Sequence, residues 1–351
     1  MFPKAKIATT VIVSTVLLSG CGLFGGEPAM KEIDPPQDVT YNEDGTKLEE
    51  GTSEDETSTD TQDDATAEMV THELYLIDDK GFVVPESFQL PKAEAPAKQV
   101  LEYLVDGGPV SNMLPNGFRA VLPAGTEMTT NLLEDGTLVV NFSPEFAEYK
   151  AEDEKRILES ITWTLTQFES IKNVKIKING HDQNEMPVNK TPIQGELTRA
   201  DGINVDNSGV VDVMNSDLLT LYFLSQQGDD HTYYVPITRR VSAISDENKI
   251  MATVVKELID GPSLVSGLVS EFNLEAELLS DPEYKDGVVT LNFNEAIFGN
   301  LEKTMVSKHV LNSLVLSLTE QPGVESVSIQ VGGKELSEPV VRPQTVNTGE
   351  F

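Results

Sequence analysis

The octapeptide DGTLVVNF at residues 135–142 returns as DGVVTLNF at residues 286–293, 151 residues further along the chain. Working outward, four shorter stretches repeat in the same order at separations of 147–154 residues. They are LYL at 74–76 with LYF at 221–223, LVDG at 104–107 with LIDG at 258–261, TLT at 164–166 with SLT at 317–319, and VKIKING at 174–180 with VSIQVGG at 327–333. Such an ordered series indicates an internal duplication. We predict repeats at residues 71–200 and 215–345, a linker at 201–214 and a tail at 346–351.

Each repeat carries the same succession of secondary-structure signals, β-β-α-β-β-α-β. The first helix of each repeat has apolar residues at helical spacing and is followed by a glycine, Gly107 or Gly261, where a left-handed cap is expected. The Asp-Gly pairs at 135–136 and 286–287 predict hairpin turns. The other expected elements are strands at 72–77, 82–84, 174–178, 218–224, 233–237 and 327–331, and second helices at 152–169 and 302–319. We predict an α+β fold with a mixed or mostly antiparallel sheet, in which each repeat buries its own core.

The N-terminus has the features of an export signal. Lys4 and Lys6 precede an apolar run at 7–18, which is too short to span a bilayer because a spanning helix needs about 20 residues. The run ends in LSGC at 18–21, which resembles the bacterial lipobox, and Cys21 is the only cysteine in the sequence. We predict a lipoprotein signal peptide at 1–20 and a diacylated Cys21 that holds the protein to a membrane. The alternative is an ordinary secretory signal with an incidental cysteine.

A strongly acidic segment follows Cys21. The chain has a net charge of −33, and residues 22–70 hold 15 acidic residues against two lysines. A segment with so few apolar residues cannot offset its ordering entropy by burial, so we predict a disordered acidic linker at 21–70. An acidic tail that binds a partner is the alternative. The negative charge argues against nucleic acid as a partner and against electrostatic docking on anionic lipids.

We find no arrangement of residues with the spacing of a catalytic or metal site. The sequence has no hydrolase elbow, phosphate loop or zinc-protease motif, and its single cysteine is assigned to lipid. Asp201, Asp206 and Asp212 loosely suggest calcium, but their spacing differs from that of a calcium loop. The four histidines, expected to be structural or surface residues, are His72, His181, His231 and His309. We therefore predict no enzyme activity, no cofactor and no metal.

One pair of apolar residues stands apart from the expected core. In the second helix of the first repeat, Trp163 points away from the apolar stripe, and Leu316 occupies the matching position in the second repeat. An apolar residue outside the stripe in both copies makes these residues a candidate interface with a partner protein. The alternative is packing within the chain, against the other repeat or against the tails that begin near Pro187 and Pro339.

Several of these stretches resemble the GerMN domain. They are ITWTLTQF at 161–168, the NG pair at 179–180, the pattern L-x-D-G-x-P at 104–109 and DGTLVVNFS at 135–143. The second repeat departs from the pattern, with Ser317 in place of the first threonine and QPG at 321–323 after the helix. The resemblance implies a non-enzymatic fold similar to the ring-building modules of secretion assemblies. A lipobox ahead of two such domains implies a sporulation and germination lipoprotein of Bacillus-type spore formers.

The resemblance also implies a location and partners. We expect the protein on the extracytoplasmic face of the cell membrane, on the outer forespore membrane facing the intermembrane space. There it would support the channel between mother cell and forespore by contact with other protein subunits. The alternative function is a cell-wall module that binds peptidoglycan, although one tryptophan in 351 residues offers little aromatic surface for glycan.

Overall fold

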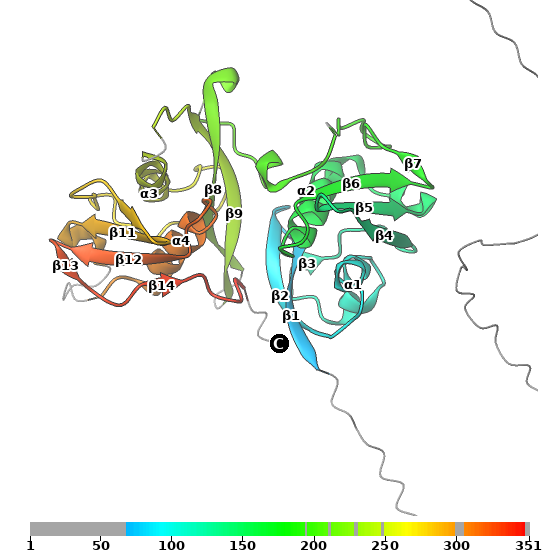
Figure 1. The fold of residues 1–351 in the computed structure, drawn as a ribbon, viewed down its shortest axis with the longest axis horizontal. Coiled ribbons are helices and arrows are strands. Elements are labelled where there is room, and N and C mark those ends of the chain that lie inside the picture. Colours follow the sequence, from blue (N-terminus) through cyan, green and yellow to red (C-terminus); the bar gives the residue numbers. More distant parts are fainter. Residues whose placement is uncertain are drawn as a thin grey trace, which may run out of the picture. The chain divides into compact units, whose positions relative to one another are not determined.

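The computed structural model describes residues 68–193, 195–209, 212–227, 231–246, 249–298 and 305–347. All of these residues belong to one compact unit. The predicted signal peptide, Cys21 and nearly all of the predicted acidic linker lie outside the described residues. Both repeats therefore belong to one folded unit, and each shows the same two-sheet arrangement (Figure 1).

The first repeat consists of a strand pair, two helices and a second sheet. The β5–β6 pair is parallel and the other pairs of both sheets are antiparallel, because a helix connects β5 to β6. The elements are β1 (Met69–Asp78), β2 (Val83–Pro91), α1 (Pro96–Tyr103), β3 (Phe118–Arg119), β4 (Met128–Leu132), β5 (Thr137–Phe142), α2 (Glu154–Leu165), β6 (Asn173–Ile178) and β7 (His181–Asp182). The strand orders are β2-β1-β3 and β4-β5-β6-β7.

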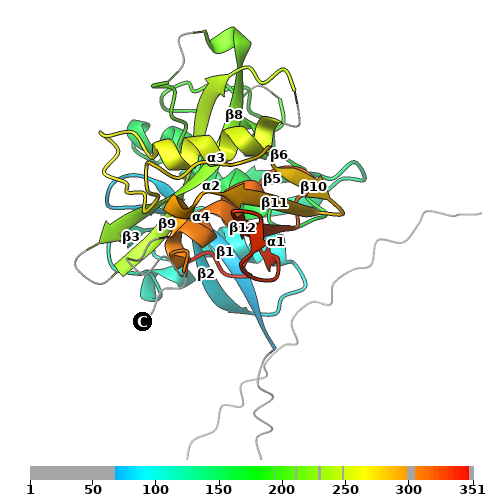
Figure 2. The ribbon, with the colours of Figure 1, turned by 90° about the vertical axis from the view of Figure 1, so that its left-hand side faces the viewer.

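The second repeat copies this plan with small differences. Its opening sheet consists of the two long strands β8 and β9, and the β11–β12 pair is again parallel across a helix. The elements are β8 (Ser216–Gln227), β9 (His231–Ser242), α3 (Ile250–Asp260), β10 (Glu283–Lys285), β11 (Val288–Phe293), α4 (Lys308–Leu318), β12 (Ser326–Val331), β13 (Lys334–Glu335) and β14 (Val340–Val341). Figures 1 and 2 both place α4 along β8, in agreement with the contacts between these elements. Short 3-10 helices lie at 109–112, 144–147, 151–153, 199–201, 213–215 and 295–297.

The turns follow the local sequence only in part. Gly107 and Gly261 adopt φ values of 72° and 80°, which glycine reaches without steric cost. The expected left-handed caps are wrong, because α1 ends earlier with Leu104 as its cap and Gly261, the cap of α3, has an extended ψ of −179°. In the second repeat the hairpin turn has positive φ at both Asp286 and Gly287, the geometry that matches the twist of the flanking strands. The predicted order β-β-α-β-β-α-β and the mixed sheets are confirmed, and the structure adds the short strands β3, β7, β13 and β14, which were not predicted. The second strands are longer than expected, since β2 extends to Pro91 and β9 to Ser242.

The repeats do not enclose separate cores. Buried apolar residues of both repeats, from Leu74 to Val331, belong to one continuous cluster. The expectation of one core per repeat is therefore wrong. The strand pairs β1–β2 and β8–β9 meet at the centre of the molecule, with β2 in contact with β9 (Figure 1). Sequence periodicity shows which side chains are apolar, but it does not show against what they pack.

The predicted linker at 201–214 and tail at 346–351 contain packed segments. Ile203 is fully buried and Asp206 pairs with β9, so residues 203–206 extend the β8–β9 pair. In the tail, Val346 and Asn347 are buried, and residues 348–351 lie outside the described residues. Each repeat is thus followed by a short segment that returns to the contact between the strand pairs.

Candidate functional site between the repeats

In the first repeat, a helix covers the part of the β1 edge that β3 leaves unpaired. The amide of Tyr75 donates to the Thr164 hydroxyl at 3.0 Å, and the Ser160 hydroxyl donates to the Tyr75 carbonyl. The Gln167 side chain accepts from the Glu73 amide at 3.0 Å and donates to the Glu73 carbonyl at 2.7 Å. The backbone groups of β1 that have no partner strand on this side are thus hydrogen-bonded by side chains of α2 and of Gln167, which follows α2.

The second repeat uses the same device with a different residue. The amide of Tyr222 on β8 donates to the Ser317 hydroxyl of α4 at 2.9 Å. Thr164 and Ser317 are the first residues of the repeated TLT and SLT stretches. The change from threonine to serine therefore keeps the hydroxyl that the strand edge requires.

Replacing Thr164 by Val should lower the free energy of unfolding by about 1–2 kcal/mol, because it leaves the buried Tyr75 amide without an acceptor. The loss of the Ser317 hydroxyl in Ser317→Ala should cost a similar amount through Tyr222. Urea denaturation measures both, with the exposed Thr129→Val on β4 as the control. A loss no larger than that of the control would show that the strand edge does not need the hydroxyls.

Two prolines sit opposite the same tyrosines. Pro85 pairs with Tyr75 in β2, and Pro236 pairs with Tyr222 in β9. At this register the backbone groups of the tyrosine point away from its partner strand, towards the helix, so the proline needs no N–H for the ladder. The carbonyl of each proline points outwards and accepts a hydrogen bond from an asparagine side chain, Asn347 or Asn204, at 2.8 Å.

These two asparagines join the repeats in equivalent ways. Asn204 exchanges hydrogen bonds with the backbone of Val83 in β2 and donates to Pro236 in β9. Asn347 exchanges hydrogen bonds with the backbone of Tyr234 in β9 and donates to the Pro85 carbonyl in β2. Each asparagine thus binds one strand with its whole amide and the other strand with one N–H.

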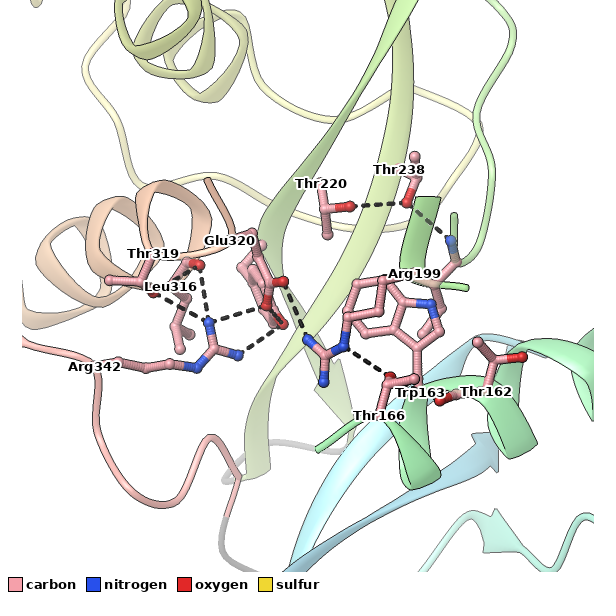
Figure 3. A network of polar contacts seen from close by, with 12 residues as sticks. Thr162, Trp163, Thr166, Arg199, Thr220, Thr238, Leu316, Thr319, Glu320 and Arg342 are labelled. Atoms are coloured by element: carbon pink, nitrogen blue, oxygen red, sulfur yellow. Dashed lines mark hydrogen bonds and ion pairs between the residues drawn. The ribbon is translucent and has the colours of Figure 1, made fainter. Parts of the chain in front are cut away.

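A charged cluster completes the contact (Figure 3). The Glu320 carboxylate accepts from Arg199 at 3.2 Å and from the Tyr222 hydroxyl at 2.8 Å, and it pairs with Arg342 at 3.0 Å. Arg199 also donates to the Thr166 hydroxyl, and Arg342 donates to the Thr319 hydroxyl. Thr166 and Thr319 are the last residues of the repeated TLT and SLT stretches, so the two arginines are structural counterparts.

The arginines of this cluster also act on Glu73 of β1. Burial raises the pKa of Glu73, and the positive charges of Arg342 and Arg199 oppose this rise. Burial and the Glu320 carboxylate together raise the pKa of the Tyr222 hydroxyl, which therefore stays protonated and donates. The carboxylate of Glu320 partners both arginines at once, and it is the centre on which the cluster depends.

The contact between the repeats is consequently a pseudo-two-fold one. Strand β2 meets its counterpart β9, and each tail supplies an arginine followed five residues later by an asparagine, at 199 and 204 and at 342 and 347. A contact in which both partners present the same face is self-complementary and closed. In this protein the shared face of the two repeats is buried in the contact within the chain. The recurring Arg-x-x-x-x-Asn spacing is a sequence signal that the search for repeats missed.

The candidate interface residues Trp163 and Leu316 lie inside the molecule. Trp163 is 1% exposed, donates from Nε1 to the Gly202 carbonyl at 3.2 Å and carries the Arg199 guanidinium 4.4 Å from its ring centre. Leu316 is fully buried in a small cluster that includes Tyr222 and Val346. The structure therefore places both residues in packing within the chain, and neither is exposed to an external partner.

The other residues singled out by sequence serve local structure. Asp201 caps its own turn, Asp206 binds Ser208 and Arg239, and Asp212 caps the 3-10 helix at 213–215. Within the described ranges no group of three potential ligands is arranged to hold a metal ion. Among the helices that the structure describes, none combines the length and apolar character that a membrane span requires.

The four histidines do not come together. His72 is buried beside Phe168, and the ring of His231 lies 5.6 Å from that of Tyr233. His181 is exposed in β7, and His309 shares a hydrogen bond of 3.0 Å with the Tyr234 hydroxyl.

Comparison with known proteins agrees with this architecture. The chain is 50% identical to the spore germination protein GerM of Bacillus subtilis (strain 168), over 99% of this chain and 98% of that protein. The solved structure of the tandem GerMN domains of the sporulation protein GerM from Bacillus subtilis matches with a TM-score of 0.76 and 52% identity, covering 81% of this chain and all of that one. The family model Germane, described as sporulation and spore germination, matches residues 73–184 and 220–337. The chain belongs to the Germane family of sporulation and spore germination proteins and carries tandem GerMN domains.

Proposed function

We propose that this protein is a lipid-anchored, extracytoplasmic assembly protein of sporulation and spore germination. The similarity to GerM carries the proposal, because it extends over 99% of the chain and therefore includes nearly all of the N-terminal 67 residues. Those residues contain the lipobox-like LSGC at 18–21 and the acidic segment. We place the protein on the outer forespore membrane facing the intermembrane space, where it supports the mother cell–forespore channel by contact with protein subunits.

The contact between the repeats supports a role as a rigid assembly unit. Its polar groups are engaged with one another: Glu320 with the two arginines, the asparagines with strand backbones, and the helix hydroxyls with strand edges. These groups hold two GerMN domains in one orientation. A fixed pair of domains presents its outer surfaces to partners at constant spacing, which is useful in an assembly.

The Cys21→Ala variant tests the anchor in sporulating cells. The natural protein should sediment with membranes and dissolve in detergent, and the variant should leave the membrane fraction, because the acyl chains that hold it cannot be added. Spore yield and germination should fall in parallel. The exchange Ser19→Ala, which keeps a small residue before Cys21, is the control.

Two results would contradict the proposal. One is a natural protein found in the cytosol with residues 1–20 still attached. The other is retention on purified peptidoglycan together with no protein subunit co-purifying from membranes, which would favour the cell-wall alternative.

A further inference from the structure

A pocket of about 320 Å³ lies in the first repeat between α2 and the segment that follows β7. Its walls include the apolar side chains of Leu158 and Leu197. Its charged residues are Lys155 and Glu159 from the helix, and Glu196 and Asp201 from the facing segment. Three carboxylates against one ammonium give the pocket a negative charge. None of these residues takes part in the charged cluster between the repeats.

Glu159 is the distinctive group of this pocket. Its side chain is 8% exposed, and its Oε1 atom lies buried without a hydrogen-bond partner. The nearest cation is Lys155, one helical turn earlier, whose Nζ stands 3.5 Å from Oε1 and whose side chain is 57% exposed. Burial raises the pKa of Glu159, and Lys155 and a hydrogen bond from the Asn204 backbone oppose this rise. A buried carboxylate oxygen that accepts no hydrogen bond is energetically unfavourable. A ligand that donates a hydrogen bond to this oxygen removes that cost, which favours binding.

We propose that this pocket binds the ammonium end of an aliphatic amine, as found in a lysine-like side chain of a peptide or in a free diamine. The ammonium supplies Oε1 with a donor closer than the Lys155 Nζ, which stands 3.5 Å away, and charge-assisted hydrogen bonds are the strongest of their kind. The methylene stem packs along Leu158 and Leu197 while the charged end reaches the carboxylate. Lys155 already brings an ammonium to this oxygen from the solvent side, and a ligand displaces it.

The second repeat lacks this site. The repeated TLT and SLT stretches align Glu159 with Asn312, whose side-chain amide donates to the Tyr234 hydroxyl at 3.1 Å. The amide is neutral and already engaged. Each chain therefore binds one amine, in the first repeat.

Titration of the purified full-length protein by calorimetry tests the proposal. The probes are Nα-acetyl-lysine-N-methylamide, 1,5-diaminopentane and, as the uncharged analogue of the same length, Nα-acetyl-norleucine-N-methylamide. We expect one site per chain for the amines and no heat from the norleucine probe. A stronger response to the capped lysine assigns the site to peptides, and a stronger response to the diamine assigns it to free polyamines.

Three variants separate a binding site from simple packing. Glu159→Gln should weaken amine binding about tenfold or more, because a charged acceptor is lost. Lys155→Ala should strengthen it, because the competing ammonium is removed. The exposed Glu169→Gln should leave it unchanged. The proposal is overturned if no amine binds, if the norleucine probe binds equally well, if Glu159→Gln binds like the natural protein, or if Lys155→Ala abolishes binding.

Discussion

Replacing Glu86 by Gln should stabilise the protein by about 2–4 kcal/mol at pH 8 and remove the contribution of Glu86 to the pH dependence of its stability between pH 5 and 8. Glu86 lies in β2 opposite Leu74, is 1% exposed, and neither carboxylate oxygen has a hydrogen-bond partner. Burial raises its pKa from 4.5 to about 8. The charged form is therefore strongly disfavoured in the folded protein.

The sign of the effect follows from the two pKa values of Glu86. The folded protein keeps the proton up to about pH 8, whereas the unfolded chain releases it near pH 4.5. The contribution of Glu86 to stability is consequently complete below pH 4.5 and is lost as the pH rises towards 8. Glutamine has the same shape and no charge, so the loss disappears in the variant.

Urea denaturation at pH 5, 6, 7 and 8 measures this difference. The window avoids the titration of Glu154, whose hydrogen bonds from Thr191, Asn189 and Tyr149 outweigh burial and lower its pKa to about 2. Glu94→Gln, at an exposed position just before α1, is the matched control. Equal stabilities of the natural protein and the Glu86→Gln variant at pH 8 would contradict the prediction.

Replacing Glu320 by Ala should lower the free energy of unfolding by about 3–5 kcal/mol. The carboxylate is 10% exposed and partners Arg199 and Arg342, which are themselves 31% and 27% exposed. Without it, two largely buried guanidinium groups face each other and lose the carboxylate that pairs with both of them. The strain should fall on the contact between the repeats, so amide hydrogen exchange in β2 and β9 should increase more than exchange in β5.

Two further variants control for this prediction. Glu185→Ala removes an exposed ion pair with Lys190 and should change stability by less than about 0.5 kcal/mol. The triple change Arg199→Met, Glu320→Leu and Arg342→Met removes all charges of the cluster and should recover most of the lost stability. If Glu320→Ala unfolds at the same urea concentration as Glu185→Ala, the cluster does not hold the repeats together.

The contact between the repeats was only partly predictable. Thr164 and Thr166 belong to a stretch that the duplication marked, and they proved to be the residues that bind the strand edge and Arg199. The partners Arg199, Glu320 and Arg342 are single charged residues in an acidic chain, and nothing local distinguishes them. The repeated spacing of arginine and asparagine in the two tails could have indicated this contact. These residues are 143 residues apart, whereas the other repeated stretches are 147–154 residues apart, so an alignment of the repeats with one fixed offset does not bring them together.

The sequence by itself determined the duplication, the order of the main strands and helices and the hairpin turns, because these depend on the spacing of apolar residues and on backbone preferences within a few residues. The tertiary structure alone decided which faces are covered. Helix α2 contacts β1, β6 and α1, and its Trp163 packs under Arg199 and Gly202, so a side chain that points away from the core stripe is still buried. The spacing of apolar residues distinguishes an apolar and a polar face of a helix. Burial depends in addition on which segments, distant in the sequence, pack against each face.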